Sequence, residues 1–118
     1  MNYNFSNNQP IYLQIVRQLE REIISGARSP GDRVESVREL AIKIKVNPNT
    51  VQRALTELEN KEIIETERTK GRFVTKNKTK ILKLRDKYLH QKTEEYLKEM
   101  KNLKIDKQEI INQIKENY

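Results

Sequence analysis

The sequence contains no cysteine, no tryptophan and a single histidine, His90. The absence of cysteine excludes disulfide bonds, thiolate metal sites and cysteine nucleophiles, and it agrees with a reducing compartment. His90 lies between Leu89 and Gln91 and is expected to be a partly exposed helix residue, because a metal-binding histidine needs companion ligands. The carboxylates occupy mostly capping or solvated helix positions. We therefore expect no enzyme, no metal site and no cofactor.

Long hydrophobic runs are also missing, because no stretch reaches the roughly 18 apolar residues that a membrane-spanning helix needs. Residues 1–8 lack the basic start and apolar region of a signal peptide, so we expect a cytoplasmic protein. A length of 118 residues leaves room for one small domain and an appendage, which excludes a large catalytic or ligand-binding domain. The net charge of +7 favours a polyanionic partner, either nucleic acid or an anionic membrane.

The segment that begins at Val46 has the pattern of a DNA recognition helix. Asn47 is a good N-cap, and Pro48 falls at the first helical position, where its missing N–H is no loss. Apolar residues at helical spacing predict one buried face: Val51, Ala54, Leu55 and Leu58. Polar side chains that can pair with base edges and phosphates gather on the other face: Asn49, Gln52, Arg53 and Thr56.

A short helix is predicted just before this segment. Ser36 and Glu39 form a capping box, in which Ser36 caps the helix and Glu39 reaches back. The apolar positions of the helix keep helical spacing: Val37, Leu40, Ala41 and Ile44. Only Lys45 and Val46 separate it from the Asn47 cap, which is a helix-turn-helix connection. An ordinary helical hairpin remains the alternative.

The flanking segments complete a winged helix-turn-helix domain over residues 1–76. A polar lead ends at Gln9, and a core-facing helix follows and stops at Gly26. Residues 29–32 form a turn that leads into Arg33-Val34, a candidate very short strand. Residues 63–67 and 72–75 are two β-capable runs around residues 68–71, which is the pattern of a hairpin.

Residues 77–118 contain no glycine or proline, and we expect them to be helical with one break. Apolar residues recur every seven positions, with Met100 between them, and could pack against a partner helix: Leu82, Leu89, Tyr96, Met100 and Leu103. A second stripe lies beside them: Ile81, Leu84, Tyr88 and Leu97. Asp106 and Glu109 form another capping box, so a last helix is predicted to begin there and to bury Ile110, Ile111 and Ile114. We expect a two-helix dimerisation region, with an intramolecular hairpin as the alternative.

The chain resembles GntR-family transcriptional regulators from Pro10 to about Val74. The residues that carry the resemblance are Pro10-Ile11-Tyr12-Leu13-Gln14-Ile15, Gly26, Pro30-Gly31-Asp32-Arg33, Ser36-Val37-Arg38-Glu39-Leu40-Ala41, Asn49-Thr50-Val51, Arg53-Ala54-Leu55, Gly71 and Phe73-Val74. The segment from Val46 to Gln52, followed by a short two-helix tail, is similar to the YtrA-like subfamily. The resemblance implies a mainly α protein with a small β-wing that binds an inverted-repeat operator as a homodimer. It also implies a repressor of its own operon and of adjacent ABC-transporter genes.

The resemblance also implies which residues contact DNA. Arg38 matches the family arginine at the start of the second helix, and a phosphate partner would explain a cation at that helix end. Further matches are the recognition-helix positions Asn47, Asn49, Thr50 and Gln52, and the wing tip Lys70-Gly71. Arg72 beside the tip joins the candidates, although Lys70 and Arg72 could instead be gatekeeping charges on an edge hairpin.

The chain departs from the family pattern at several turns. Pro48 stands where many members have arginine, which shifts the expected base reading toward Asn49, Gln52 and Arg53. Val34-Glu35 replaces a usual Leu-Pro pair. Glycine is usual at three other positions, which here hold Lys45, Glu62 and Thr69. If the backbone still needs a positive φ there, each replacement costs on the order of 1 kcal/mol.

Other readings of the sequence stay open. Tyr88, Tyr96 and Tyr118 could line a small-molecule effector pocket at a dimer interface, although aromatic residues at helical spacing more often serve packing. A basic amphipathic arm could act as a membrane-surface adaptor, but its apolar face lacks tryptophan and phenylalanine. A winged helix used for protein contacts alone is a further alternative to specific DNA recognition. The operator, the regulated genes, any effector, and repression as against activation do not follow from these residues.

Overall fold

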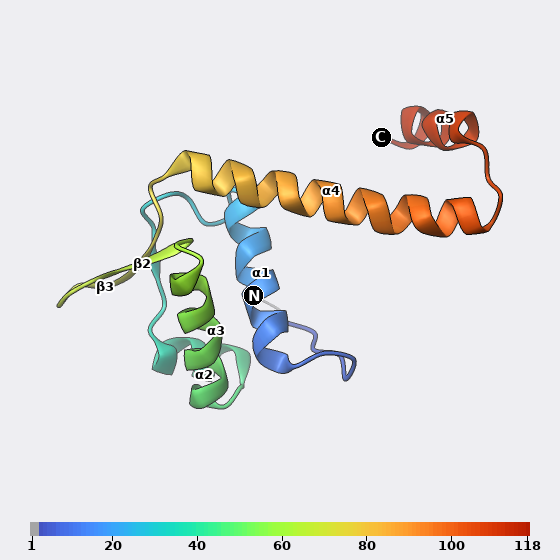
Figure 1. The fold of residues 1–118 in the computed structure, drawn as a ribbon. Coiled ribbons are helices and arrows are strands. Elements are labelled where there is room, and N and C mark those ends of the chain that lie inside the picture. Colours follow the sequence, from blue (N-terminus) through green and yellow to red (C-terminus); the bar gives the residue numbers. More distant parts are fainter. Residues whose placement is uncertain (1–2) are drawn as a thin grey trace. The chain divides into compact units, whose positions relative to one another are not determined.

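The computed structural model describes residues 3–118, which form helices α1 to α5 and three short strands (Figure 1). Contacts divide the chain into two compact units, residues up to Leu84 and residues from Arg85 onward. The division falls inside α4. The first unit holds the hydrophobic core, in which α1 and α2 pack against α3, and α3 packs against the sheet.

Helix α1 runs from Ile11 to Ser25 and ends where the sequence predicts. Gly26 takes a left-handed φ of 85°, and its N–H donates to the carbonyl of Ile23. The core-facing side of α1 is buried: Ile15, Val16, Leu19 and Ile23. This stripe packs against α3, so the first helix supports the predicted recognition helix.

Helices α2 (Val37–Ile44) and α3 (Pro48–Asn60) form the predicted helix-turn-helix. The amide of Glu39 donates to Ser36 Oγ at 3.1 Å, and the amide of Ser36 donates to Glu39 Oε1 at 3.4 Å, which completes the capping box. At the start of α3, Asn47 Oδ1 accepts from the amide of Asn49 at 2.8 Å. Both helices therefore begin at caps that local sequence encodes.

Three strands form an antiparallel sheet in the order β1-β3-β2. Strands β2 (Ile64–Glu67) and β3 (Gly71–Val74) make the predicted hairpin, which extends away from the helices in Figure 1. The two-residue β1 (Arg33–Val34) pairs with β3 and ties the hairpin to the rest of the domain. Each strand buries an apolar residue in the core, namely Val34, Ile64 and Val74.

The three turns that carry Lys45, Glu62 and Thr69 keep the left-handed backbone that glycine favours. Their φ values are 57°, 62° and 72°, respectively. The backbone therefore still has a positive φ at these positions, and each non-glycine residue there costs on the order of 1 kcal/mol of folding free energy. The fold retains its turn geometry with non-glycine residues in place.

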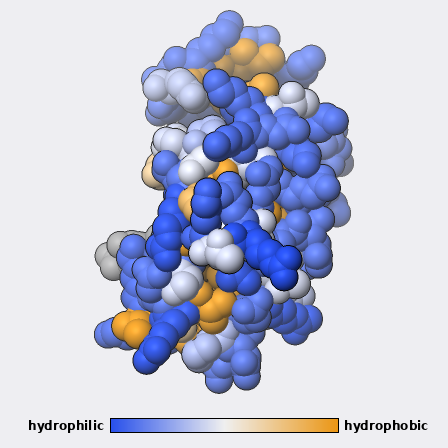
Figure 2. Space-filling model, turned by 90° about the vertical axis from the view of Figure 1, so that its left-hand side faces the viewer, coloured by the Kyte–Doolittle hydropathy of each residue, from blue (hydrophilic) through white to orange (hydrophobic). Residues whose placement is uncertain are grey.

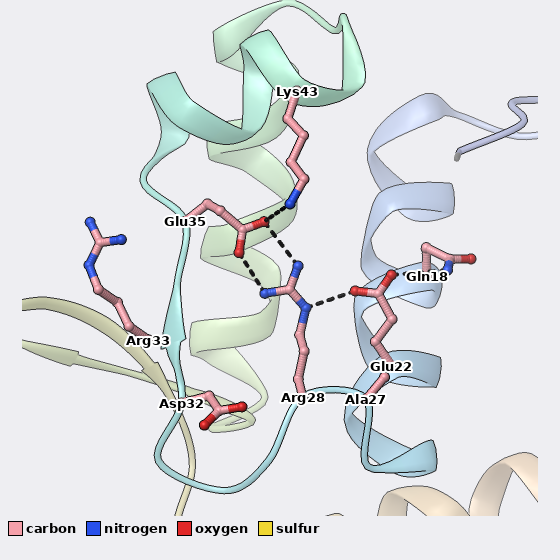
Figure 3. A pocket seen from close by; sticks show the side chains of 8 residues that line it. All are labelled: Gln18, Glu22, Ala27, Arg28, Asp32, Arg33, Glu35 and Lys43. Carbon is pink, nitrogen blue, oxygen red and sulfur yellow. Dashed lines mark hydrogen bonds and ion pairs between the residues drawn. The ribbon is translucent and has the colours of Figure 1, made fainter. Parts of the chain in front are cut away.

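A charged cluster closes the loop between α1 and α2 (Figure 3). Arg28 lies between Glu22 of α1 and Glu35, which precedes α2: its Nε is 2.7 Å from Glu22 Oε1 and its Nη1 is 2.8 Å from Glu35 Oε1. Lys43 of α2 reaches Glu35 Oε2 at 3.7 Å. Glu35 stands where the family usually has proline, and here it holds the start of α2 by ion pairs rather than by a fixed φ.

The charges in this cluster shift the pKa of its members. Hydrogen bonds from Arg28 lower the pKa of Glu35 to about 2. Burial opposes the charge of Arg28, but its hydrogen bonds to Glu35 and Glu22 outweigh that effect, so its pKa is raised. Glu35 and Arg28 are therefore both charged near neutral pH.

The polar lead predicted before Gln9 is more ordered than its composition suggests; Met1 and Asn2 lie outside the described residues. Tyr3 and Phe5 are half-buried against the core, and their rings meet edge to face with centroids 5.8 Å apart. Gln14 binds the backbone of Ser6 in both directions, at 2.8 Å each. The packing of these two aromatic residues within the polar lead was not predicted from the sequence.

Helix α4 runs from Lys78 to Asn102 and starts inside the first unit. There Ile81 and Leu84 pack against the winged-helix core, so part of the second predicted stripe is covered within the chain. The side chain of Lys80 also pairs with Glu62 at 2.8 Å. No helix within residues 3–118 is long and apolar enough to cross a membrane.

In the second unit, α4 ends at a break near Lys104, which has a φ of 61°. Helix α5 (Lys107–Asn117) then begins at the predicted Asp106 capping box. Ile110 is buried and Ile111 half-buried, but Ile114 is 55% exposed, so the prediction that α5 buries all three was wrong. Helix α5 has only eleven residues and one neighbouring helix in its unit, so only part of its own apolar face is buried.

Candidate nucleic-acid interface

Helix α3 presents a polar face to solvent. Its buried side is made by Val51, Ala54, Leu55 and Leu58, all of them 0% exposed. Since successive residues are about 100° apart, Asn49 lies nearest the centre of the opposite side, with Thr56 and Arg53 close to it on its two sides. Gln52 lies further round, beyond Thr56, and all four side chains are exposed. Thr50 is half-buried at the edge of this face.

The wing borders α3 on the Gln52 side. Glu59, seven residues or about two turns beyond Gln52 on α3, accepts from Arg72 Nε of β3 at 2.9 Å and from the hydroxyl of Thr66 of β2. Burial raises the pKa of Glu59, but these hydrogen bonds outweigh it and the net pKa is lowered. Arg72 is therefore occupied in joining the wing to α3. Sequence reasoning did not identify Glu59, whose charge resembles that of any solvated helix residue.

Helix α1 borders α3 on the other side. The guanidinium carbon of Arg53 lies 3.8 Å above the ring centroid of Tyr12, in the first turn of α1. This is a cation–π stack between two elements of the domain. The sequence did not reveal this stack, because periodicity within one helix says nothing about a side chain on another.

Two polar side chains of α3 are oriented by local hydrogen bonds. Gln52 Nε2 donates to Thr56 Oγ1 at 3.1 Å, one turn further along, which leaves the carbonyl oxygen of Gln52 available. Asn47 uses its carbonyl oxygen as the helix cap, so its amide nitrogen remains as the donor. The predicted base readers are thus partly ordered before any DNA arrives.

The remaining predicted contacts are at the first turn of α2 and at the wing tip. Arg38 is exposed, and no residue of the described chain pairs with its guanidinium. Lys70 and Gly71 are exposed at the turn between β2 and β3. Gly71 has a φ of 113°, and a Cβ built there would meet no atom within 4 Å, so its backbone conformation, rather than space, favours glycine.

The net charge of +7 suits a polyanionic partner. Figure 2 shows a face on which hydrophilic residues predominate and hydrophobic ones occur in small separate patches. A helix-turn-helix with an exposed polar recognition helix, a free arginine on α2 and a β-wing defines a DNA-binding protein of the winged helix-turn-helix class.

Comparison with known proteins names the family. Residues 11–74 match the model of the bacterial regulatory proteins, gntR family. The chain is 40% identical over 115 residues to the uncharacterized HTH-type transcriptional regulator YhcF of Bacillus subtilis, and this match covers 98% of this chain and 95% of that protein. It is 46% identical over 71 residues to the HTH-type transcriptional repressor YtrA of the same species, and this match covers 60% of this chain and 55% of that protein.

A solved structure agrees with these matches. A GntR family transcriptional regulator from Listeria monocytogenes is 44% identical, with a TM-score of 0.90, and the match covers 97% of this chain and 100% of that one. The chain belongs to the GntR family, and its relatives, YtrA-type regulators among them, are transcriptional regulators and not enzymes. It is a DNA-binding transcriptional regulator.

Proposed function

We propose that this regulator binds an inverted-repeat operator as a homodimer and represses its own operon together with adjacent transporter genes. The observation that supports specific DNA reading most strongly is the exposed polar face of α3. Its two flanking side chains, Gln52 and Arg53, are each oriented by a neighbour within the domain. Such a regulator meets the chromosome in the bacterial cytoplasm.

The proposed roles of the site residues follow from the side chains that remain available. Asn49 and Gln52 are the base readers, since an amide can donate and accept at adenine at once. Thr50 and Asn47 assist at the start of α3. Cations that keep their donors available contact phosphates or the minor groove: Arg38, Arg53 and Lys70 with Gly71. We assign Arg72 to holding the wing in place, because Glu59 occupies it.

The proposed dimer rests on an apolar stripe that the described chain leaves uncovered. Exposed fractions are 53% at Leu82, 63% at Leu89, 43% at Tyr96 and 60% at Leu103, with half-buried Met100 between them. Leu103 lies one residue beyond α4, yet its amide still donates to the Glu99 carbonyl at 3.1 Å, so it continues the helical register. A repeat of seven residues is the spacing that packs two helices together.

The proposal of repression has a narrower basis. The matched protein YtrA is described as a repressor, and the family resemblance implies control of the regulator's own operon and of transporter genes. A dimer that binds two half-sites about 34–36 Å apart covers enough DNA to obstruct a promoter. The role of a small-molecule effector has no comparable support in the described residues.

The test is a selection of duplexes by the full chain from a random-sequence pool, followed by footprinting. We expect an inverted repeat, with protection on one face of the DNA in two successive major grooves. Binding without any enriched sequence would contradict the proposal. Enrichment of a single unrepeated half-site would retain DNA reading but overturn the dimer.

A further inference from the structure

The Tyr12–Arg53 stack separates Arg53 from the other arginines of the domain. Arg28, Arg33 and Arg72 each donate an N–H of the guanidinium edge to a carboxylate. Arg53 is held by its flat face instead, 3.8 Å above the Tyr12 ring centroid, and within residues 3–118 no side chain accepts a hydrogen bond from it. A stack of this kind leaves the five N–H donors of the edge available.

The stack also sets the direction in which Arg53 points. Tyr12 lies in the first turn of α1, which borders α3 on the side opposite the wing. Arg53 is therefore drawn away from the centre of the polar face, marked by Asn49, toward the rim. When α3 enters a major groove, the rim faces a sugar–phosphate backbone and the centre faces the base edges.

We propose that Tyr12 is a positioning residue for DNA binding, which stacks on Arg53 and presents its guanidinium edge to a phosphate at the rim of the major groove. The inference rests on the proposed entry of α3 into that groove. A guanidinium fixed before binding loses less rotamer freedom when it meets the phosphate, so the stack raises affinity without reading sequence. Tyr12 itself need not touch DNA.

The experiment is a double-mutant cycle on the full chain, with Tyr12→Leu, Arg53→Ala and the double variant. Affinity is measured by fluorescence anisotropy on two probes: a duplex selected by the protein and a scrambled duplex of the same length. Tyr12→Phe keeps an aromatic face and serves as the conservative variant. Thermal midpoints of all variants show whether each remains folded.

We expect Tyr12→Leu to lower affinity about two- to fivefold on both duplexes, and Tyr12→Phe to restore it to within about twofold. In the Arg53→Ala background, Tyr12→Leu should have no further effect. Arg53→Ala itself should reduce the slope of log affinity against log salt by about one.

Three results would overturn the inference. The first is an undiminished loss from Tyr12→Leu when Arg53 is already alanine. The second is a Tyr12→Phe variant as weak as Tyr12→Leu, which would mean that the hydroxyl contacts DNA itself. The third is wild-type affinity for Tyr12→Leu. If the wild-type protein binds both duplexes equally, the proposed specific function fails, yet the cycle on the scrambled duplex still decides the role of Tyr12.

Discussion

At the scale of single residues, four arginines of the winged helix differ in how their guanidinium groups are engaged within the described chain. Arg28 donates through Nε, Nη1 and Nη2 to two carboxylates, and Arg72 donates its Nε to Glu59, whereas no residue of the described chain accepts a hydrogen bond from Arg38 or Arg53. The sequence shows that all four are basic, but it does not show which of them pair with a carboxylate. This difference depends on partners that are distant along the chain, such as Glu59 for Arg72 and Tyr12 for Arg53.

Gln52→Ala should relax base preference rather than abolish binding. The carboxamide is oriented by Thr56 and can pair in two directions with adenine, which is worth about 1–3 kcal/mol of discrimination. Affinity for the selected duplex should fall by that amount, while affinity for a scrambled duplex should stay within about twofold of wild type. Gln91→Ala, on α4, is the control. Equal losses on both duplexes would show that Gln52 does not read bases.

Thr69→Gly should stabilise the wing. Thr69 is β-branched and sits at a φ of 72°, where the Cβ of an L-residue is crowded. Relief of that strain, offset by the greater freedom of glycine in the unfolded chain, should raise the free energy of unfolding by about 0.5–1 kcal/mol. Urea unfolding measures the change. Arg68→Gly, one residue earlier, should instead lower the free energy of unfolding. If both variants were stabilised, the positive φ of Thr69 would not be the cause.

At the scale of elements, local rules predicted the helices better than the sheet. The caps at Ser36, Asn47 and Asp106 are encoded within three residues, and each marks an observed helix start. The pairing of β1 with β3 joins segments far apart in the chain, and no periodicity of two residues can reveal it. The predicted burial of Ile114 failed for a related reason, because burial depends on which distant segments pack against the helix, and this is not encoded in the local sequence.

The Arg28 cluster makes a pH-dependent contribution to stability by joining α1 to the segment that precedes α2. The pKa of Glu35 is about 2 in the folded protein, against an ordinary value of 4.5, so its stabilising effect is complete above about pH 4.5 and is lost as the pH falls toward 2. At pH 7, Glu35→Gln should cost about 1–3 kcal/mol of unfolding free energy, because Arg28 loses a charged partner.

Urea midpoints at pH 7 and near pH 2 measure this effect. The difference between wild type and Glu35→Gln should shrink at the lower pH, where Glu35 is increasingly protonated in the folded chain too. Glu67→Gln, which changes an exposed carboxylate of β2, is the control and should leave the midpoint nearly unchanged. A difference that is constant with pH would contradict the ion-pair account.

At the scale of the whole molecule, the uncovered stripe on α4 should hold two copies together. The double variant Leu82→Gln/Leu89→Gln removes apolar surface without changing charge, and it spares Ile81 and Leu84, which pack on the core. Light scattering should show a monomer, and affinity for the inverted repeat should fall at least tenfold, because two half-sites no longer bind jointly. Gln91→Ala on the opposite side of α4 should remain dimeric. A dimeric double variant would place the interface elsewhere.

The central claim is that the polar face of α3 makes this GntR-family chain a sequence-specific DNA-binding protein. The most direct measurement is the ratio of wild-type affinities for the selected and the scrambled duplex, taken by anisotropy at several salt concentrations. We predict a ratio on the order of 10³ or more near physiological salt, with affinity for both duplexes falling linearly in log salt. Equal affinities for the two duplexes at every salt concentration would contradict the account.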